Sequence, residues 1–363
     1  MWLAKGSPPM REPGHNRLDR KPREQYAENY SAPRRWGQQI LHDKSHFLQR
    51  GARYSLAPMD VLLTGASGFF GSVCAELLAH QKDTRLYLLR SGAGDDEPSI
   101  KTHTFRAPPS LSVNDLSNTL RATSISNIIH IGALASPEAC EKNPSQANIS
   151  NVLFTEMLSS YALTTGAHLT TISTDLVFDG GKAPPEGFCE RDLPCPCSVY
   201  SRSKLAAEEA TRKNSSHAVV RVALLYGNSP SQSKGFLGWM RRAFTGGNPV
   251  SLFEDEFRTP IHVRDAARAV LEVARHKLHG IFHCGGPERL SRVDFGKRVA
   301  EVYGFEAPLI RPTTRLSHTI PPLRPEDVSL NSHALFDTLG FTPRPVEEAL
   351  HLYDKNDQQK PPG

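Results

Sequence analysis

A tyrosine and a lysine stand one helical turn apart in the segment PCSVYSRSK, residues 196–204. If a helix begins near Val199, Tyr200 and Lys204 lie on the same helix face. An ordinary tyrosine has a pKa of about 10, but a nearby cation stabilises the phenolate and lowers that pKa. A tyrosine tuned in this way can protonate a carbonyl oxygen while a hydride arrives at the carbon. Of the nine tyrosines only Tyr200 has a lysine four residues later, so we predict that this pair does acid–base chemistry.

A strand-like segment, TTISTDLVF, ends in three polar residues upstream of this pair. Thr174 lies 26 residues before Tyr200, between Ser173 and Asp175. A hydroxyl at the carboxyl end of a parallel strand points into the ligand crevice of an open sheet. We therefore predict that Thr174 holds the substrate oxygen and that Asp175 contributes to the substrate site. The alternative is an ordinary strand-end turn, where Ser, Thr and Asp are common.

Three glycines follow the first apolar strand in the segment LLTGASGFFGS. They have the spacing G-x-x-G-x-x-G and lead directly into a helical segment. Glycines allow a tight turn and a close approach of a pyrophosphate, and a helix N-terminus offers free N–H groups and the positive end of a dipole. In this strand–turn–helix setting the spacing predicts a dinucleotide-binding loop rather than a plain turn. The predicted contacts are Gly65, Ser67, Gly68, Phe69, Phe70 and Gly71.

The second strand, LYLLRSG, carries the residues that would distinguish NADP from NAD. An acidic residue at this strand end favours a free ribose 2′-hydroxyl, whereas an arginine can pair with a 2′-phosphate. Arg90 and Ser91 stand there, which predicts NADP, with NAD as the alternative cofactor. A solvated arginine at a strand end is the purely structural interpretation. Gly132 and Ala133, in the segment NIIHIGAL, complete the predicted cofactor site.

These residues need a fold that brings several strand ends together. From Met59 the chain alternates short apolar runs such as DVLLTG, RLYLLR and AVVRVALLYG with helical segments such as SVCAELLAHQ and SRSKLAAEEATRK. This alternation predicts a parallel sheet covered on both faces and doubly wound by right-handed crossovers. We predict an α/β, Rossmann-type fold with a cofactor-binding domain at residues 59–230. A smaller C-terminal α/β substrate lobe would follow at 231–353, with a frayed tail at 354–363.

Composition limits the classes of function. The formal net charge of +5 arises in the first 58 residues, which hold 11 Lys or Arg and 5 Asp or Glu, so the remaining residues sum to −1. A nucleic-acid groove is therefore not expected. The sequence has no run of about 18 apolar residues, so no membrane span is expected. The six cysteines form no C-x-x-C pair, which predicts no metal site and a reducing compartment such as the cytoplasm.

The first 58 residues are polar, proline-rich and without helical or strand periodicity. Such a composition predicts a disordered leader. It is either a targeting segment, which would place the protein in an organelle, or an upstream extension of the gene model.

Taken in order, the motifs resemble the extended short-chain dehydrogenase/reductase superfamily, and within it the dTDP-4-dehydrorhamnose reductase branch. The resemblance implies that Thr174, Tyr200 and Lys204 form the catalytic set and that Lys204 also bonds the nicotinamide ribose. Asn151 falls on a helix-bending position of the superfamily. The matching segments span roughly residues 59 to 350 and are LLTGASGFFG, NVLFTEML, STDLVFDG, VYSRSKLAAE, VVRVALLYG, FRTPIHVRDAARAV and RPEDVSLNSHALFDTLGF.

The same resemblance implies a nucleotide-sugar substrate. Relatives use two arginines that fall on Arg258 and Arg324, and an arginine fork suits bidentate contacts to a diphosphate. Ion pairs with Glu254, Asp255 or Asp327 are the structural alternative. His130, on an apolar strand, is expected to be a hydrogen-bonded core histidine rather than a catalytic residue.

Three functions fit these residues. The first is an NADP-dependent reductase that acts on a carbonyl of a small molecule such as a nucleotide sugar. The second is a non-catalytic, NADP-binding regulatory subunit similar to the beta subunit of methionine adenosyltransferase, whose partner is the catalytic subunit. The third, an epimerase or dehydratase, is less favoured because Asp175 is followed by Leu176 and not by a glutamate. The family also leads us to expect a homodimer formed through the helices at 151–165 and 200–213.

Overall fold

The computed structural model describes residues 59–90, 102–107, 112–181, 183–230, 235–305, 309–317 and 324–354 of the chain. The predictions for the leader, for Ser91 and for the tail beyond residue 354 lie outside these residues.

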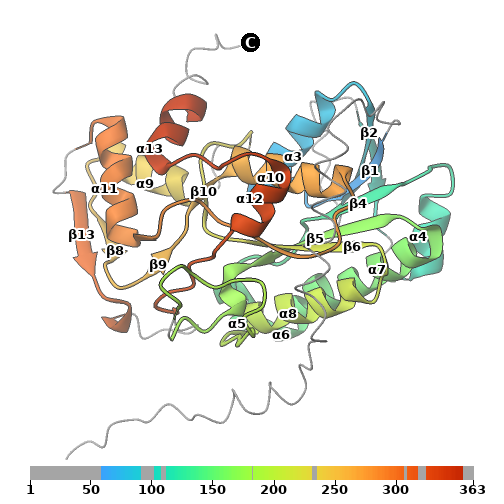
Figure 1. The fold of residues 1–363 in the computed structure, drawn as a ribbon, viewed down its shortest axis with the longest axis horizontal. Helices are drawn as coiled ribbons and strands as arrows, with labels where there is room; N and C mark the ends of the chain where they lie inside the picture. Colours follow the sequence, from blue (N-terminus) through green and yellow to red (C-terminus); the bar gives the residue numbers. More distant parts are fainter. Residues whose placement is uncertain are drawn as a thin grey trace, which may run out of the picture.

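A seven-stranded parallel sheet forms the centre of the described structure (Figure 1). Its order is β11-β6-β5-β4-β1-β2-β3, so the direction of winding reverses between β1 and β4. Ligands of open α/β sheets bind outside the carboxyl ends of the strands at such a switch point. The predicted fold class is confirmed. The strands are β1 (Met59–Thr64), β2 (Thr84–Arg90), β3 (His103–Arg106), β4 (Asn127–His130), β5 (His168–Thr174), β6 (His217–Val222) and β11 (Gly280–Cys284).

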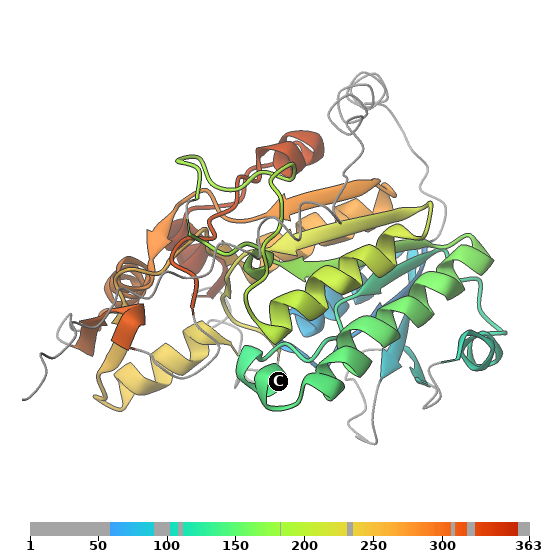
Figure 2. The same ribbon diagram turned by 90° about the horizontal axis from the view of Figure 1, so that it is seen from below.

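Helices cover both faces of this sheet (Figure 2). Side chains alternate along a strand, so Val61 and Leu63 of β1 enter one core and Leu62 enters the other. The first face carries α3 (Phe69–Ala79), α10 (Val263–Arg275) and α12 (His333–Leu339). The second face carries α4 (Val113–Thr119), α7 (Phe154–Thr165) and α8 (Val199–Arg212), with α5 (Pro137–Lys142), α6 (Pro144–Ala147) and the π-helix η1 (Asn148–Leu153) leading into α7.

The C-terminal part contains a further core and three two-stranded sheets. The sheets pair β10 (Ile261–His262) with β7 (Leu225–Tyr226), β12 (Leu290–Ser291) with β9 (Phe257–Arg258), and β13 (Ile310–Thr313) with β8 (Val250–Phe253). Around them lie α9 (Phe236–Thr245), α11 (Arg292–Tyr303), α13 (Val346–Ala349), and the short helices η2 (Asp175–Val177), η4 (Arg315–Ser317) and η5 (Leu350–Asp354).

The predicted division at residue 230 needs a correction. Strand β11 is the outer neighbour of β6 in the main sheet, and α10 packs against α3 in the main core. The chain therefore leaves the main layer after β6, builds part of the small lobe and returns. Strand β11 (Gly280–Cys284) is short and mostly buried, and it could not be distinguished from lobe structure by its pattern alone.

The helices in the described part of the chain are all too short or too polar to cross a bilayer.

Candidate active site

The glycine loop between β1 and α3 is shaped by close backbone contacts. Gly65 has a φ of 75°, and a Cβ on it would lie 2.7 Å from the backbone nitrogen of Gly132, after β4. A Cβ on Gly71 would lie 2.0 Å from the carbonyl oxygen of Gly65. Gly68 is the N-cap of α3, and its N–H donates to the Gly65 carbonyl at 2.9 Å. Loop and helix start therefore pack tightly against the end of β4 at the switch point, in a cradle whose close backbone contacts a side chain at Gly65 or Gly71 would prevent.

A hydrogen-bonded histidine ties the ends of β1 and β4 together. The Nδ1 atom of His130 lies 2.7 Å from Thr64 Oγ1, and its Nε2 atom lies 3.0 Å from Thr155 Oγ1. The Gly132 N–H donates to the same Thr64 oxygen at 3.1 Å. Burial, followed by the charge of Lys204, lowers the pKa of His130 to about 3. The prediction of a hydrogen-bonded core histidine is confirmed, and its lowered pKa makes it neutral.

Two arginines stand side by side at the carboxyl edge of β2 and β3. Arg90 ends β2 and is in register with Arg106 at the end of β3. Parallel neighbours in register lie about 4.8 Å apart, so this edge concentrates positive charge. Arg106 was not singled out from the sequence, although the segment FRAPPS at the end of a third strand was a usable signal.

Tyr200 and Thr174 meet across the gap between α8 and β5. Helix α8 begins at Val199, as predicted, with Ser198 as N-cap and a reciprocal capping box with Ser201. The half-buried Tyr200 lies close enough to Thr174, the last residue of β5, for that side chain to influence the pKa of its phenol. Thr174 Oγ1 also donates to Asp175 Oδ1 at 3.0 Å. The structure thus brings together two of the three residues of the implied catalytic set.

Lys204 completes that set one turn further along α8, with 4% of its surface exposed. Burial lowers the pKa of its ammonium to about 8, and the carboxylate of Glu208 acts in the opposite direction. Within the described residues, no hydrogen bond to the Lys204 ammonium is found. Charging a buried lysine without hydrogen-bond partners costs free energy, and its N–H donors can bind a ligand.

The pKa of Tyr200 differs from the sequence-based prediction. The pKa of Tyr200 is raised and not lowered, mainly by burial and next by the nearby Asp175 carboxylate, while the Thr174 side chain opposes both. The prediction considered only the lysine, yet the desolvated phenolate and the adjacent negative charge dominate. Tyr200 is therefore held in its protonated form in this structure.

Asn151 links the segment after β4 to α8. It lies in the π-helix η1 and is fully buried. Its Oδ1 accepts from the Leu134 N–H at 2.7 Å, and its Nδ2 donates to Ser203 Oγ at 2.8 Å. The helix irregularity expected at this position is present, and π-bulges of this kind are frequent at functional sites.

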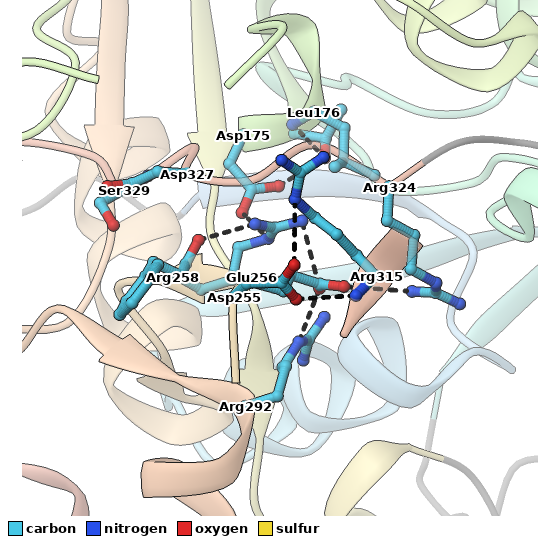
Figure 3. Close-up of polar contacts among 12 residues, drawn as sticks. Asp175, Leu176, Asp255, Glu256, Arg258, Arg292, Arg315, Arg324, Asp327 and Ser329 are labelled. Atoms are coloured by element: carbon cyan, nitrogen blue, oxygen red, sulfur yellow. Dashed lines mark hydrogen bonds and ion pairs between the residues drawn. The ribbon is translucent and has the colours of Figure 1, made fainter. Parts of the chain in front are cut away.

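Close to Thr174 and Tyr200, three arginines from three segments surround one buried carboxylate (Figure 3). Glu256 is fully buried, and its Oε1 lies 3.2 Å from Arg258 Nη2 and 2.7 Å from Arg292 Nε. Its Oε2 lies 3.9 Å from Arg324 Nη1. Arg258 Nε also lies 3.6 Å from Asp175 Oδ2, so the cluster borders Thr174 and Tyr200 directly. Arg292 was missed from the sequence, since no local pattern marks it.

The charges in this arginine cluster, defined as Arg258, Arg292 and Arg324 around Glu256, are unevenly matched. Burial alone would raise the pKa of Glu256, but Arg292 and Arg258 outweigh it and the pKa is lowered. Burial raises the pKa of Asp175, and Arg258 opposes that effect only in part. Buried atoms that lack a hydrogen-bond partner among the described residues include Arg292 Nη1 and Arg324 Nε.

The prediction that Arg258 and Arg324 form ion pairs with Glu254, Asp255 or Asp327 is wrong. Arg258 pairs with Glu256 and Asp175. Arg324 pairs with Glu256 and with Glu138, which lies 3.4 Å away on α5. Asp255 and Asp327 instead serve Arg315 and Arg289.

In the part of the chain that the structure describes, His, Cys, Asp and Glu side chains make no group of three suited to a metal ion.

The fold and the site together define an extended short-chain dehydrogenase/reductase, as the sequence motifs indicated. Residues 59–358 match the model of the RmlD substrate binding domain, and the chain belongs to that family, on its dTDP-4-dehydrorhamnose-reductase-like branch.

Among curated relatives, the chain is 29% identical over 302 residues to the probable low-salt glycan biosynthesis reductase Agl14 of Haloferax volcanii, covering 80% of this chain and 96% of that protein. It is 30% identical over 224 residues to the methionine adenosyltransferase 2 subunit beta of Rattus norvegicus, covering 60% of this chain and 66% of the subunit. The curated relatives therefore include both a reductase and a subunit of methionine adenosyltransferase.

Solved structures share the fold over 82–83% of the chain. A dTDP-4-dehydrorhamnose reductase of Clostridium acetobutylicum superposes with a TM-score of 0.70 at 25% identity, covering 83% of this chain and 100% of that chain. A dTDP-4-dehydrorhamnose reductase of Bacillus anthracis in complex with NADP has a TM-score of 0.68 at 21% identity, covering 82% and 99%. MoeE5 in complex with UDP-glucuronic acid and NAD has a TM-score of 0.67 at 23% identity, covering 83% and 99%. At the last two identities the likeness shows the fold alone.

Proposed function

We propose that the protein is an NADP-dependent oxidoreductase that reduces a carbonyl on a nucleotide-sugar-like substrate. The observation that carries the proposal is that Tyr200 and Thr174 are close enough to interact at the carboxyl end of β5, two strands from the glycine loop. A proton donor and an oxygen-holding hydroxyl thus lie on the same edge of the sheet as the cradle expected to bind a dinucleotide.

The glycine loop supports a dinucleotide site. The absence of Cβ atoms at Gly65 and Gly71 lets the loop pack tightly against Gly132 and the start of α3, where helix N–H groups favour a diphosphate. We assign Gly65, Ser67, Gly68, Phe69, Phe70, Gly71, Gly132 and Ala133 to this contact. When bound, NADPH supplies the hydride. Every other requirement of the reaction falls on side chains of this chain.

Tyr200 is the proposed acid. Its raised pKa keeps the phenol protonated at neutral pH, which is the state a reduction requires. The Thr174 hydroxyl would hold the substrate oxygen beside that proton. The buried Lys204 would place its ammonium near the ribose and stabilise the phenolate that forms when Tyr200 gives up its proton.

For the substrate, we assign recognition of a diphosphate to the arginine cluster. Arg258 forms ion pairs with Asp175 and Glu256, so we assign it the role of positioning these two carboxylates. Arg292 and Arg324 each have a buried N–H group without a hydrogen-bond partner, which could bind an anion. Fold neighbours bind nucleotide sugars, which supports this class of ligand.

For the cofactor, Arg90 and its neighbour Arg106 favour the 2′-phosphate of NADP over NAD. Structural neighbours bind NADP or NAD. We also propose a cytoplasmic location, in keeping with six free thiols. We further propose that the cofactor-binding domain ends near residue 230 and that β11 returns to its sheet from the smaller lobe. We also propose that the protein forms a homodimer.

A regulatory subunit is the second candidate, because the likeness to the methionine adenosyltransferase beta subunit covers 60% of the chain. Such a subunit would bind NADP and the catalytic subunit of methionine adenosyltransferase without needing turnover.

The test is NADPH oxidation by the full chain against a panel of 4-keto nucleotide sugars. Tyr200→Phe removes only the hydroxyl and is expected to lower turnover by at least 10²-fold while NADPH still binds. Tyr161→Phe, on α7, is the matched control and should turn over normally. Tight NADPH binding without turnover on any sugar, together with capture of the adenosyltransferase catalytic subunit, would favour the regulatory candidate.

A further inference from the structure

A buried ion pair lies directly beneath the proposed catalytic residues. Glu208 on α8 and Arg221 on β6 are 0% and 1% exposed, and they form a forked pair. Arg221 Nε donates to Glu208 Oε1 at 3.0 Å, and its Nη2 donates to Oε2 at 2.8 Å. Ser173, the residue before Thr174, donates to Glu208 Oε1 at 2.5 Å. One carboxylate therefore joins α8, β5 and β6 under the site.

Lys204 stands one helical turn before Glu208 on the same helix, and both side chains are buried. Residues four apart on a helix are neighbours, and the Glu208 carboxylate favours the charged form of Lys204. Titratable groups near Lys204 on the elements around α8 include Cys140 and Glu141 of α5, Glu156 of α7, Asp175 of η2 and Arg221 of β6, and His130 of β4 also interacts with Lys204.

Most of these neighbours are engaged elsewhere. Glu141 accepts from the Val199 N–H at 2.7 Å, and Glu156 pairs with Lys213 at 3.3 Å. Asp175 faces Arg258, and His130 is neutral between two hydroxyls. Glu208 is the carboxylate among them that is both fully buried and on the same face as Lys204.

The charge balance of the buried group decides what Glu208 does. Lys204, Glu208 and Arg221 together carry one net positive charge. Without the carboxylate, two cations would share a site of low dielectric. A guanidinium does not deprotonate in proteins, whereas a buried ammonium does so readily. The repulsion between the two cations would therefore lower the pKa of Lys204, which would lose its proton more readily.

We propose that Glu208 is the positioning residue that keeps the ammonium of Lys204 charged beneath the active site, and that Arg221 limits this effect. The inference rests on the role proposed for Lys204. It assigns a task to a buried pair that would otherwise count only as structure, and it ties the protonation of Lys204 to the strand end that carries Thr174.

The experiment measures Lys204 directly, by NMR titration of the full chain labelled with ¹³C at lysine Cε. The Lys204 resonance is identified by its loss in Lys204→Arg. In the unmodified protein its midpoint is expected near pH 8. Glu208→Gln should lower the midpoint by about one pH unit or more, a tenfold change in proton affinity. Glu209→Gln, at the next and exposed position of α8, is the matched control and should leave it unchanged.

Arg221→Met tests the same idea with the opposite sign, and it keeps the test open if Glu208→Gln does not fold. Without the guanidinium, the Glu208 carboxylate is no longer neutralised by Arg221 and stabilises the Lys204 ammonium more strongly, so the midpoint of the Lys204 titration should rise. The double variant Glu208→Gln/Arg221→Met restores the original net charge, and its midpoint should return toward that of the unmodified protein.

An unchanged midpoint in Glu208→Gln, or in Arg221→Met, would overturn the inference. So would an equal fall in Glu208→Gln and the double variant, because repacking and not charge would then be the cause. The titration does not depend on turnover. A protein that shows the predicted shifts but reduces no substrate contradicts the proposed function and leaves this inference standing.

Discussion

Tyr200, in the first turn of α8, lies beside Thr174, the last residue of β5, and the Thr174 side chain acts against the burial that raises the pKa of the phenol. Thr174 in turn donates to Asp175 at 3.0 Å. The three side chains form a short polar chain from the helix to the arginine cluster. If the proposed reaction is correct, Thr174 holds the substrate oxygen where Tyr200 can protonate it.

Thr174→Ala removes that hydroxyl from the strand end. We expect kcat for carbonyl reduction to fall by about 10²-fold, because one donor to the reacting oxygen is lost. NADPH affinity should change less than about twofold, since Thr174 is not assigned to the cofactor. Steady-state rates with fluorescence titration of NADPH measure both. Thr174→Ser should recover most of the rate, and a normal rate in Thr174→Ala would exclude its proposed role.

Gly71→Ala tests the cradle for the cofactor. The new methyl would lie 2.0 Å from the Gly65 carbonyl oxygen, so loop or helix must shift. Overpacking of this kind costs about 1–3 kcal/mol, and we expect a lower melting temperature with loss of NADPH binding. Gly181→Ala meets its nearest atom at 3.8 Å and serves as control. Unaltered NADPH affinity in Gly71→Ala would rule out this loop as the diphosphate site.

Glu256→Gln tests the arginine cluster. Removing the central charge leaves buried arginines uncompensated, and we expect a loss of about 3 kcal/mol in the free energy of unfolding. Inorganic pyrophosphate should raise the melting temperature of this variant more than that of the unmodified protein, because an anion replaces the lost charge. Glu326→Gln removes a 53%-exposed partner of Arg315 and should change stability by less than about 0.5 kcal/mol. Absence of any pyrophosphate effect would speak against anion binding there.

Acid stability should reflect the buried histidines. Burial is the main cause that lowers the pKa of His130, His168 and His283 to about 3 and that of His217 to about 4. The unfolded chain binds more protons than the folded protein between these values and about 6.5, so stability falls as the pH is lowered through that window. Each histidine contributes a slope of up to about 1.4 kcal/mol per pH unit.

Urea unfolding at several pH values measures this slope. His168→Gln should flatten the slope. A stability that does not change between pH 6.5 and about pH 4.5 would contradict the predicted linkage.

The features with local signals could be predicted from the sequence. The prolines and Ser198 before Val199 mark the start of α8, and that start is confirmed. The spacing of Gly65, Gly68 and Gly71 predicts a strand–turn–helix, which is present. His130 sits in an apolar strand and is buried with both nitrogens bonded.

The features that depend on contacts between distant segments could not be predicted from the sequence. Glu256 meets Arg292 and Arg324 only because irregular segments of the C-terminal part converge. Strand β11 joins the main sheet through pairing with β6, which its five residues do not reveal. The raised pKa of Tyr200 depends on burial and on Asp175, neither of which is visible in the spacing to Lys204.

The most direct test of the central claim is transfer of deuterium from NADPH labelled at the nicotinamide C4 to a 4-keto nucleotide sugar, followed by mass spectrometry of the sugar. The account predicts deuterium in the product with the unmodified chain and a loss of at least about 10²-fold with Tyr200→Phe. Equal transfer by both proteins, or tight NADPH binding with no transfer to any sugar on the panel, would contradict it.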